Sequence, residues 1–178
     1  STISGNTAGG DGGGLYNTGF TFLVDTTLAE NSTGIATNDN FVALQGTLLA
    51  NVGANCAVLA ADTLFSEGHN LSDDATCDAP LTATGDLRNV AAQLEPLQAN
   101  APGATPTHAL GLTSPARDAG SCTLDIALAG YTYPGATETI DPGVDLAADQ
   151  RGVARPQRLT CDIGAFEPLN SAPLAGDD

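Results

Sequence analysis

The sequence contains no Met, no Trp and no Lys, and only eight of its 178 residues are Phe or Tyr. So few aromatic rings argue against strong sugar binding by ring stacking. The longest purely apolar run, CAVLAA at residues 56–61, is far shorter than the roughly 18 residues of a membrane-spanning helix, so no membrane insertion is predicted. Because the chain also starts inside a repeated pattern without Met, we expect it to be a piece of a longer precursor.

Positive charge is scarce as well. Five Arg oppose 21 acidic residues, which gives a formal net charge of −16. A surface of this sign repels phosphate backbones and anionic lipids, so nucleic acid and membrane surfaces are poor candidate partners. The simplest interpretation of the charge is a solvated acidic surface. The apolar fraction of 42% still allows one domain with a sizeable core, and 21 Gly with ten Pro favour turns over long helices.

A repeat runs through the first third of the chain. Three segments read Thr, an aliphatic residue, two variable residues and Asn, and their Thr residues are 25 and then 20 positions apart. This spacing is typical of solenoids, in which each unit is one coil stacked on the next. The segments are TISGN (2–6), TLAEN (27–31) and TLLAN (47–51).

Apolar residues alternate with period two just upstream of each repeated Thr, which indicates strands rather than helices. A fainter copy of the pattern surrounds Thr63. The residue before each Thr is polar or Gly, and we interpret it as a bend because an unpaired Asp pointing inward would be costly. The bend positions are Thr26, Gly46 and Asp62, and the alternating pairs are Phe22 with Val24, Val42 with Leu44 and Val58 with Ala60.

Each of the three clear repeats ends on Asn, at Asn6, Asn31 and Asn51. Stacked coils would place these amides above one another, where the donor of one side chain meets the acceptor of the next. Asn also tolerates the left-handed backbone of tight corners. The glycine run AGGDGGGLYN at residues 8–17 is interpreted as a coil corner too. A phosphate-binding loop would continue with Gly-Lys-Ser/Thr, whereas this run continues with Leu-Tyr.

Three motifs in the second half resemble the closing region of bacterial choice-of-anchor Q proteins: THALGLTSPARDAG (107–120), DQRGVARPQ (149–157) and CDIGAFE (161–167). These are large exported proteins with right-handed parallel β-helices. The STISGN and GGGLYN units resemble their repeats, which are similar to polymorphic outer-membrane protein repeats. The resemblance covers nearly all of residues 1–168 and implies an extracellular or bacterial cell-surface location. Arg117 departs from it, because the family more often has an aliphatic residue there.

The repeat and the resemblance together predict an all-β chain, namely a right-handed parallel β-helix with an irregular, disulfide-pinned C-terminal cap. We expect three segments. They are the coils at residues 1–75, the cap at residues 76–168 and a linker at residues 169–178 that leads to a missing following domain. The last of these ends in SAPLAGDD, which resembles the opening of a cadherin-like or immunoglobulin-like repeat.

Four cysteines occur, none of them in a C-x-x-C pair. The two histidines, His69 and His108, do not fall at zinc-finger spacing and are interpreted as packed or turn residues. Two disulfides in an exported protein are therefore the preferred interpretation. Four cysteines allow three connectivities, and order along the sequence favours first with second and third with fourth. The expected disulfides are Cys56–Cys77 and Cys122–Cys161.

Three of the five Arg lie in one run near acidic residues, at Arg151, Arg155 and Arg158. The Arg side chain makes bidentate bonds to carboxylates, which suits a fixed structural pair. We interpret the run as ion pairs that hold the end of the fold, with substrate recognition as the alternative. The predicted structural residues are Asp149, Arg151, Arg155, Asp162 and Glu167.

No catalytic site is predicted, and we do not expect an enzyme. A β-helical polysaccharide lyase needs clustered carboxylates and an Arg or Lys base, and residues 1–70 contain neither Arg nor Lys. A glycoside hydrolase needs two carboxylates about 5 to 9.5 Å apart across one cleft, and no aligned pair emerges. No cofactor is predicted. Asp141, Asp145 and Asp149 offer calcium-type ligands, although their spacing does not match an EF-hand loop.

The expected function is structural, as an extracellular or cell-surface β-helix module. A coil edge left unpaired at the start of the chain would recruit other strands, so we expect a homo-oligomer or a filament built by head-to-tail stacking. Two alternatives stay open. One is an adhesin or carbohydrate-binding module with surface glycans as partners, and the other is a fragment of a polysaccharide lyase or hydrolase.

Overall fold

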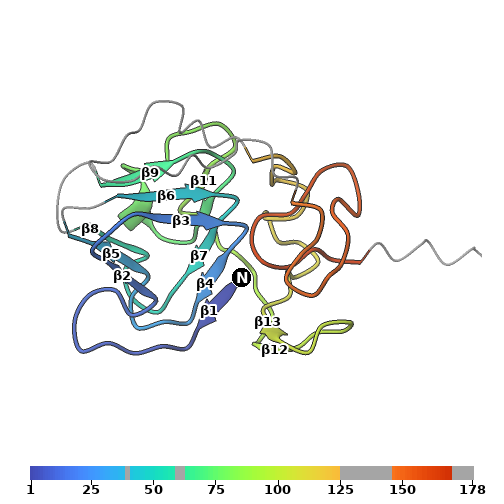
Figure 1. Cartoon of the computed structure of the whole chain (residues 1–178), viewed down its shortest axis with the longest axis horizontal. Helices are drawn as coiled ribbons and strands as arrows, with labels where there is room; N and C mark the ends of the chain where they lie inside the picture. The colour runs from blue at the N-terminus through green and yellow to red at the C-terminus, as the bar shows by residue number, and fades with distance from the viewer. Residues whose placement is uncertain (39–40, 59–62, 125–145, 170–178) are drawn as a thin grey trace, which may run out of the picture.

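Short strands from successive coils pair in parallel and form three sheets around one apolar interior (Figure 1). The computed structural model describes residues 1–38, 41–58, 63–124 and 146–169. Three coils are complete, because three times in succession the chain adds one strand to each sheet. The predicted fold class, an all-β parallel β-helix with an irregular cap pinned by disulfides, is confirmed.

The largest sheet, which we call the five-stranded sheet, contains only parallel neighbours. Its strands are short, because each coil turns a corner after two to four residues. Its last strand, β11, lies past residue 75, in the segment expected to form the cap. In spatial order the strands are β1 (Thr2–Ser4), β4 (Thr27–Ala29), β7 (Leu48–Ala50), β10 (Leu71–Ser72) and β11 (Leu87–Arg88).

Two three-stranded sheets complete each coil, and they are also parallel throughout. We name them by their strands. The β2–β5–β8 sheet contains Leu15–Asn17, Ile35–Thr37 and Cys56–Val58, and the β3–β6–β9 sheet contains Thr21–Val24, Val42–Gln45 and Leu64–Ser66.

The predicted alignment of the third repeat is wrong by one residue. Leu48 rather than Thr47 lies opposite Thr27, and Leu49 lies opposite Leu28. Leu28 and Leu49 belong to the coil interior, whereas Leu48 packs outside it against the C-terminal region. Both faces of β7 are buried, so both are apolar, and a period-two pattern could not fix the register.

The strand before the corner shows the same one-residue shift. Phe22 lies opposite Ala43, and Leu23 lies opposite Leu44. Leu23 packs against the coil interior, while Phe22 packs against Phe41 at a ring distance of 5.7 Å. The run of four residues at β3 is almost continuously apolar, so its sequence could not show which residues point inward.

The fainter copy of the repeat around Thr63 is also misplaced. Thr63 precedes β9, and its carbonyl accepts a hydrogen bond from the N–H of Val42, so it belongs to the β3–β6–β9 sheet. The next coil starts at Leu71 instead, in β10. The predicted bend at Asp62 and the pattern residue Ala60 lie outside the described residues.

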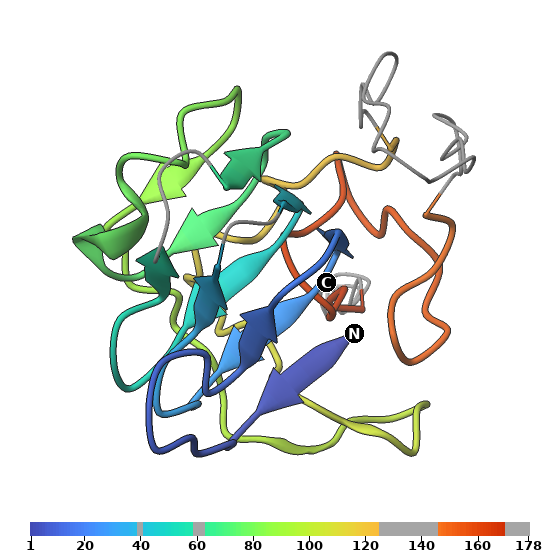
Figure 2. The ribbon, with the colours of Figure 1, turned by 60° about the vertical axis from the view of Figure 1, so that its left-hand side comes forward.

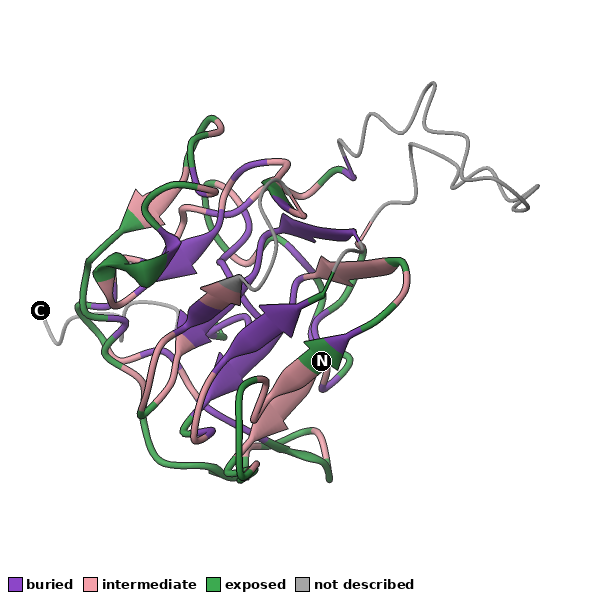
Figure 3. Ribbon diagram, turned by 90° about the vertical axis from the view of Figure 1, so that its left-hand side faces the viewer, coloured by how far each residue is buried: buried purple, intermediate pink, exposed green. Residues whose placement is uncertain are grey.

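One apolar core fills the coils. The strands of the second coil are almost fully buried, whereas the first coil is only partly covered (Figure 3). At the opposite end, the 3-10 helix η1 (Ala75–Cys77) and Leu81 close the interior, and the Cys56–Cys77 disulfide joins η1 to β8 as predicted. The buried residues of this core are Leu28, Ile35, Val42, Leu44, Leu49, Cys56, Leu64, Cys77 and Leu81.

A second core lies on the outer face of the five-stranded sheet. The chain after β11 does not simply cover the end of the stack but runs along this outer face (Figure 2). It includes one antiparallel hairpin, β12 (Gln98–Ala99) and β13 (Pro106–Thr107). Except for Leu169, the predicted linker lies outside the described residues. The second core contains Leu48, Leu71, Ala92, Leu110, Ala116, Ile163 and Phe166.

Candidate functional site

An asparagine ladder runs along one corner of the coils, where the repeat predicted it. Asn6 Nδ2 donates to Asn31 Oδ1 at 2.9 Å, and Asn31 Nδ2 donates to Asn51 Oδ1 at 2.8 Å. The backbone N–H of each donor residue bonds to the same oxygen, at 3.0 and 3.2 Å. Glu30, with a φ of +58°, is the extra residue that brings Asn31 back level with Asn51 despite the shifted register of β4 and β7.

The ladder has a fourth member that the repeat did not reveal. Asn51 Nδ2 and its N–H donate to Asn55 Oδ1, at 2.8 and 2.9 Å. Asn55 follows Asn51 by only four residues, so no coil-length spacing pointed to it. Its own amide donates to Ser72 Oγ and Asp73 Oδ1, which ends the ladder at the last coil.

The C-terminal region touches the coil stack closely at the corner between the β3–β6–β9 sheet and the five-stranded sheet. The N–H of Gly164 donates to the Gly46 carbonyl at 2.8 Å, and the N–H of Ala165 donates to Thr27 Oγ1 at 3.0 Å. Gly164 has a φ of +100°, and a Cβ there would lie 2.6 Å from Thr27 Oγ1. Only glycine fits both the backbone conformation and the approach.

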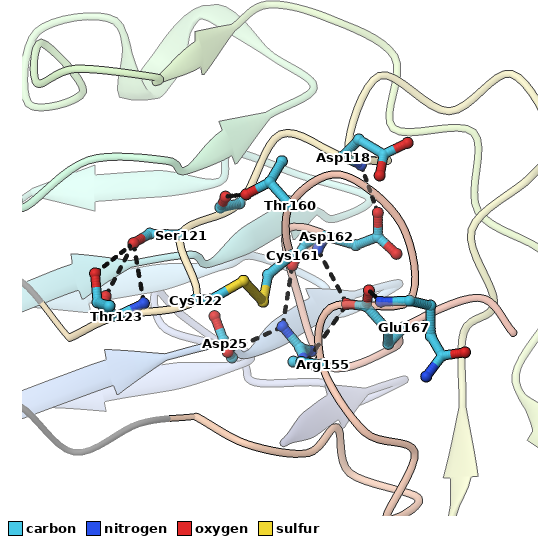
Figure 4. Close-up of a disulfide and its surroundings, with 12 residues drawn as sticks. Asp25, Asp118, Ser121, Cys122, Thr123, Arg155, Thr160, Cys161, Asp162 and Glu167 are labelled. Atoms are coloured by element: carbon cyan, nitrogen blue, oxygen red, sulfur yellow. Dashed lines mark hydrogen bonds and ion pairs between the residues drawn. A yellow bond between two sulfur atoms is a disulfide. The ribbon is translucent and has the colours of Figure 1, made fainter. Parts of the chain in front are cut away.

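Arg155 lies at the centre of a buried polar cluster that joins this corner to the C-terminal region (Figure 4). Its Nη1 donates to Asp25 Oδ2 at 2.9 Å and to the Asp162 carbonyl at 3.0 Å, and its Nη2 donates to the Gly164 carbonyl. Its Nε makes no hydrogen bond within the described parts of the chain, although Glu167 Oε2 lies 3.8 Å away. We call Asp25, Arg155, Asp162 and Glu167 the clasp.

The clasp brings the three closing motifs together. Glu167 accepts hydrogen bonds from the N–H of Gln157 at 2.9 Å and of Asp162 at 3.0 Å. Asp162 Oδ1 accepts from the N–H of Asp118. The predicted Cys122–Cys161 disulfide lies beside these bonds and ties the same segments covalently (Figure 4).

Burial raises the pKa of Asp25 to about 6, because lost hydration outweighs the adjacent Arg155 guanidinium, and Glu167 adds repulsion. Burial also raises the pKa of Asp162 to about 6, against the hydrogen bond from Asp118 and with repulsion from Glu167. The clasp therefore holds two carboxylates, those of Asp25 and Glu167, beside one guanidinium, with the Asp162 carboxylate buried nearby. Protonation of Asp25 or Asp162 relieves the excess negative charge.

A second ion pair lies next to the clasp, and the sequence predicted both partners. Arg151 donates to Asp149 Oδ2 from Nε at 2.9 Å and from Nη2 at 2.7 Å. The guanidinium carbon lies 3.6 Å from the ring centre of Phe166, which adds a cation–π contact. Burial acts to raise the pKa of Asp149, but hydrogen bonds from Glu167, Arg151 and Val153 outweigh it and hold that pKa below its ordinary value.

A polar seam ties β1 to the C-terminal region. Thr2 Oγ1 donates to Gln150 Oε1 at 2.7 Å, and Ser4 Oγ bonds to His108 Nε2 at 2.8 Å. The other ring nitrogen of His108, Nδ1, lies 2.9 Å from the Glu95 carbonyl, and because a carbonyl only accepts, Nδ1 is the donor in that bond. His108 is thus packed, in keeping with its sequence interpretation.

Some of these contacts could not be predicted from the sequence. The repeat pattern does not single out Asp25, yet Asp25 is the ion-pair partner of Arg155. Arg158, placed in the predicted Arg run, lies on the surface 3.8 Å from Asp118 and outside the clasp. Arg117 lies partly buried with Nη1 3.5 Å from the Leu110 carbonyl.

The carboxylates near the clasp are used by the protein itself. Both oxygens of Asp149 accept hydrogen bonds from backbone N–H groups or from Arg151. Asp141 and Asp145, the other two residues of the calcium hypothesis, lie outside the described residues. Within the described ranges, no group of three or more His, Cys, Asp or Glu side chains could hold a metal ion.

Four of the five Phe gather on the outer side of the β3–β6–β9 sheet. Phe41 stacks on Phe20 and on Phe65, with ring centres 5.8 and 4.9 Å apart, and Phe22 leans against it. Phe20 and Phe65 are 38% and 36% exposed. We call these residues the Phe cluster. The sequence showed four separate Phe and gave no sign that they meet.

No protein-family model, curated protein or solved structure matches the chain. Two disulfides indicate an oxidising, non-cytoplasmic environment. A search of the described residues for a helix long and apolar enough to cross a bilayer finds none.

Proposed function

We propose that the chain is a structural β-helix module of an exported protein and works in the extracellular space or at the bacterial cell surface. The clasp carries this proposal. It joins Asp25 and Arg155, which are 130 positions apart, and its charged groups bind other parts of the same chain. Such use of charge favours a device for holding a fold over a site that holds a ligand. The resemblance of the closing motifs to those of choice-of-anchor Q proteins supports the location.

Stability measurements on two Arg variants test the structural role. Arg155→Met removes a fully buried guanidinium and leaves buried carboxylates without a partner, so we expect a loss of about 3–5 kcal/mol in unfolding free energy. Arg158→Met is the matched control, because Arg158 is exposed and its pair with Asp118 contributes less than about 1 kcal/mol. Equal small losses in both variants would remove the main support for the proposal.

Antibody labelling of the cells that make the protein tests the location. Labelling of intact cells supports a surface or extracellular role. Labelling that appears only after the cells are permeabilised would contradict it. Protein isolated from the same cells should also be tested for both disulfides, because the fold contains both and they form in oxidising compartments.

Self-association is the second part of the proposal. Head-to-tail stacking would require the last coil of one molecule to meet the first coil of the next. Residues 73–81 lie over the last coil, with Cys77 and Leu81 fully buried there, and stacking would have to displace them. We therefore propose that copies of the chain do not stack head to tail. Electron micrographs that show regular fibres of the 178-residue chain would overturn this proposal.

A glycan-binding adhesin is the second candidate function, and the Phe cluster is the observation that favours it. Aromatic faces bind the apolar faces of sugar rings, and two of these rings are more than one-third exposed. A glycan array tests this function directly. Binding that Phe20→Ala abolishes and Tyr16→Ala leaves unchanged would support it, because Tyr16 is an exposed ring on the β2–β5–β8 sheet. An array without any binding would contradict it.

A further inference from the structure

The inner core and the second core are held together by different means. The inner core is formed by Leu, Ile and Val side chains and one disulfide, and it contains no charged residue. In the second core, the coils contribute two buried Leu, and the C-terminal side contributes Leu110, Ile163 and Phe166 beside two Ala. We call residues 92–124 and 146–167, which contain these side chains, the outer layer. Because apolar stabilisation grows with the area buried, it holds the outer layer less firmly than the coils.

The buried charges belong to the outer layer and to its contact with the coils. Within the described ranges, six charged residues are at most 9% exposed, and four of them are acidic while two are Arg. When all six are ionised, this region holds two more negative than positive charges. An uncompensated buried charge opposes the contact that buries it, and protonation of a carboxyl group removes this cost. The six residues are Asp25 on the coil side and Asp149, Arg151, Arg155, Asp162 and Glu167 in the outer layer.

The outer layer is bonded within itself as one unit. The N–H of Gly120 donates to the Cys161 carbonyl at 2.7 Å, and the N–H of Ile163 donates to the Ala116 carbonyl at 2.9 Å. The Cys122–Cys161 disulfide joins the same two segments covalently. The parallel strand pairs of the coils all precede the outer layer in the sequence. The outer layer can therefore separate from the coils as a cooperative unit without breaking a strand pair of the coils.

Asp25 is the one buried carboxylate that the coils contribute, and Arg155 of the outer layer is its ion-pair partner (Figure 4). The pKa of Asp25 is raised to about 6, because burial and repulsion from Glu167 outweigh attraction to Arg155 and to the Ser1 amino group. Separation returns Asp25 to water and to an ordinary pKa of 3.8. A carboxyl group whose pKa is higher in the joined state stabilises that state at low pH, and this stabilisation is lost as the pH rises through 6.

The neighbouring carboxylates do not reverse this direction. The pKa of Asp162 is also raised to about 6, because burial and repulsion from Glu167 and Asp118 outweigh the hydrogen bond from the Asp118 N–H and attraction to Arg117. Burial acts to raise the pKa of Asp149, but hydrogen bonds, above all from the Glu167 N–H, hold that pKa below its ordinary value. Asp149 therefore stays ionised over the range in which Asp25 and Asp162 lose their protons.

We propose that the outer layer is a pH-sensitive cover, which separates from the coils as one unit as the pH rises while the coils stay folded. In the joined state, the outer layer covers the outer face of the five-stranded sheet (Figure 2). In the separated state, that face is exposed with Leu48 and Leu71 and can contact other molecules. The cover goes beyond the structural role proposed above, which Arg155→Met tests at one pH.

Amide hydrogen exchange of the whole oxidised chain at pH 5.0 and pH 7.5 tests the cover, with rates corrected for the intrinsic effect of pH. The N–H groups of Gly164 and Ala165 donate to the coils and report separation, whereas those of Ile35 and Val42 donate between coils and report unfolding. Because Asp25 also reaches water when the whole chain unfolds, the level of protection distinguishes the two events. We expect about tenfold or lower protection at the first pair than at the second, and about a tenfold loss at the first pair between pH 5.0 and pH 7.5.

Two outcomes of the exchange measurement would overturn the cover. Equal protection at the two pairs of amides would mean that the chain opens only by complete unfolding. Lower protection at Gly164 and Ala165 that is the same at both pH values would remove the control by pH. The measurement needs no substitution, so it decides the question even where a variant does not fold.

Two variants identify the titrating group. Asp25→Asn removes the buried carboxylate, and Asn accepts the positive φ of 42° at this position. This variant should reduce the pH-dependent loss of protection at Gly164 and Ala165 about tenfold. Asp11→Asn is the matched control, because it removes an exposed carboxylate of the first coil and should keep the wild-type loss. Equal losses in the two variants would overturn the role of Asp25.

Discussion

Acidification should stabilise the folded chain through two buried carboxyl groups, those of Asp25 and Asp162. The pKa of Asp25 is raised to about 6 in the folded state, against an ordinary value of 3.8. A carboxyl group with a raised pKa binds its proton more tightly when folded, so its contribution is complete below pH 3.8 and is lost as the pH rises through 6. Burial between the corner of the coils and Arg155 is the physical origin of this effect.

The size of the effect follows from the two pKa values. The difference between a pKa of 3.8 and one of about 6 means that protonation of Asp25 can add at most about 3 kcal/mol to the free energy of unfolding. About 1.4 kcal/mol of this is gained when the pH falls from 7.5 to 5. In a chain of this length, that gain raises Tm by about 3–5 °C. Asp162, whose pKa is also raised to about 6, acts in the same direction. The lowered pKa of Asp149 affects stability only below about pH 4, outside this window.

Urea denaturation at pH 5.0 and pH 7.5, on the wild type and on Asp25→Asn, isolates the contribution. Protonation of exposed carboxylates also relieves repulsion in a chain with a net charge of −16, so the difference between the two proteins is the decisive quantity. Asn accepts the positive φ of 42° at this position and has no charge to titrate. A wild type that loses stability at pH 5, or a variant that keeps the full pH dependence, would refute the reasoning.

Three further predictions concern stability and can be checked by thermal and urea denaturation. Asn31→Ala should lower the free energy of unfolding by about 2–3 kcal/mol, because it removes a fully buried amide from the middle of the ladder. A loss below about 0.5 kcal/mol would contradict a stabilising role for the ladder. Gly164→Ala should cost clearly more than the roughly 1 kcal/mol of Gly152→Ala, since both have positive φ but only the first adds a Cβ into occupied space, and equal losses would speak against the close approach. Replacing Cys122 and Cys161 by Ser should cost about 4 kcal/mol for a 39-residue separation, and an unchanged Tm would contradict the pinning role.

The coils were predictable because their signal is local and repeated. The pattern Thr-aliphatic-x-x-Asn at coil-length spacing predicted the parallel strands. It also predicted the asparagine ladder, because the Asn that ends each repeat lies at the same corner of its coil. The register of β7 was not predictable in the same way, since Leu48 and Leu49 are both buried, one in each core. A second core on the outer face of a sheet removes the polar-apolar alternation on which register prediction depends.

The clasp was predictable only in its C-terminal half. Arg155 and Glu167 stood out because Arg is rare in this chain and acidic residues lie near it. Asp25 could not be assigned, because its partner is 130 positions away and one sequence contains no information on which distant residues meet. The Phe cluster could not be predicted for the same reason, since Phe20, Phe41 and Phe65 come from three coils.

The distance between Asp25 and Arg155 along the chain also sets an order of events during biosynthesis. A chain synthesised from its N-terminus presents β1 and the corner at Asp25 before residues 149–167 leave the ribosome. The inner core can form from the first 88 residues, but the second core on the outer face of the five-stranded sheet is complete only when Ile163 and Phe166 join it. A product that stops near residue 145 would lack Ile163 and Phe166 from the core that contains Leu48 and Leu71, and it would leave Asp25 without Arg155. Synthesis of residues 149–167 is thus the step that covers the remaining apolar surface, by which proteases and chaperones recognise unfinished proteins.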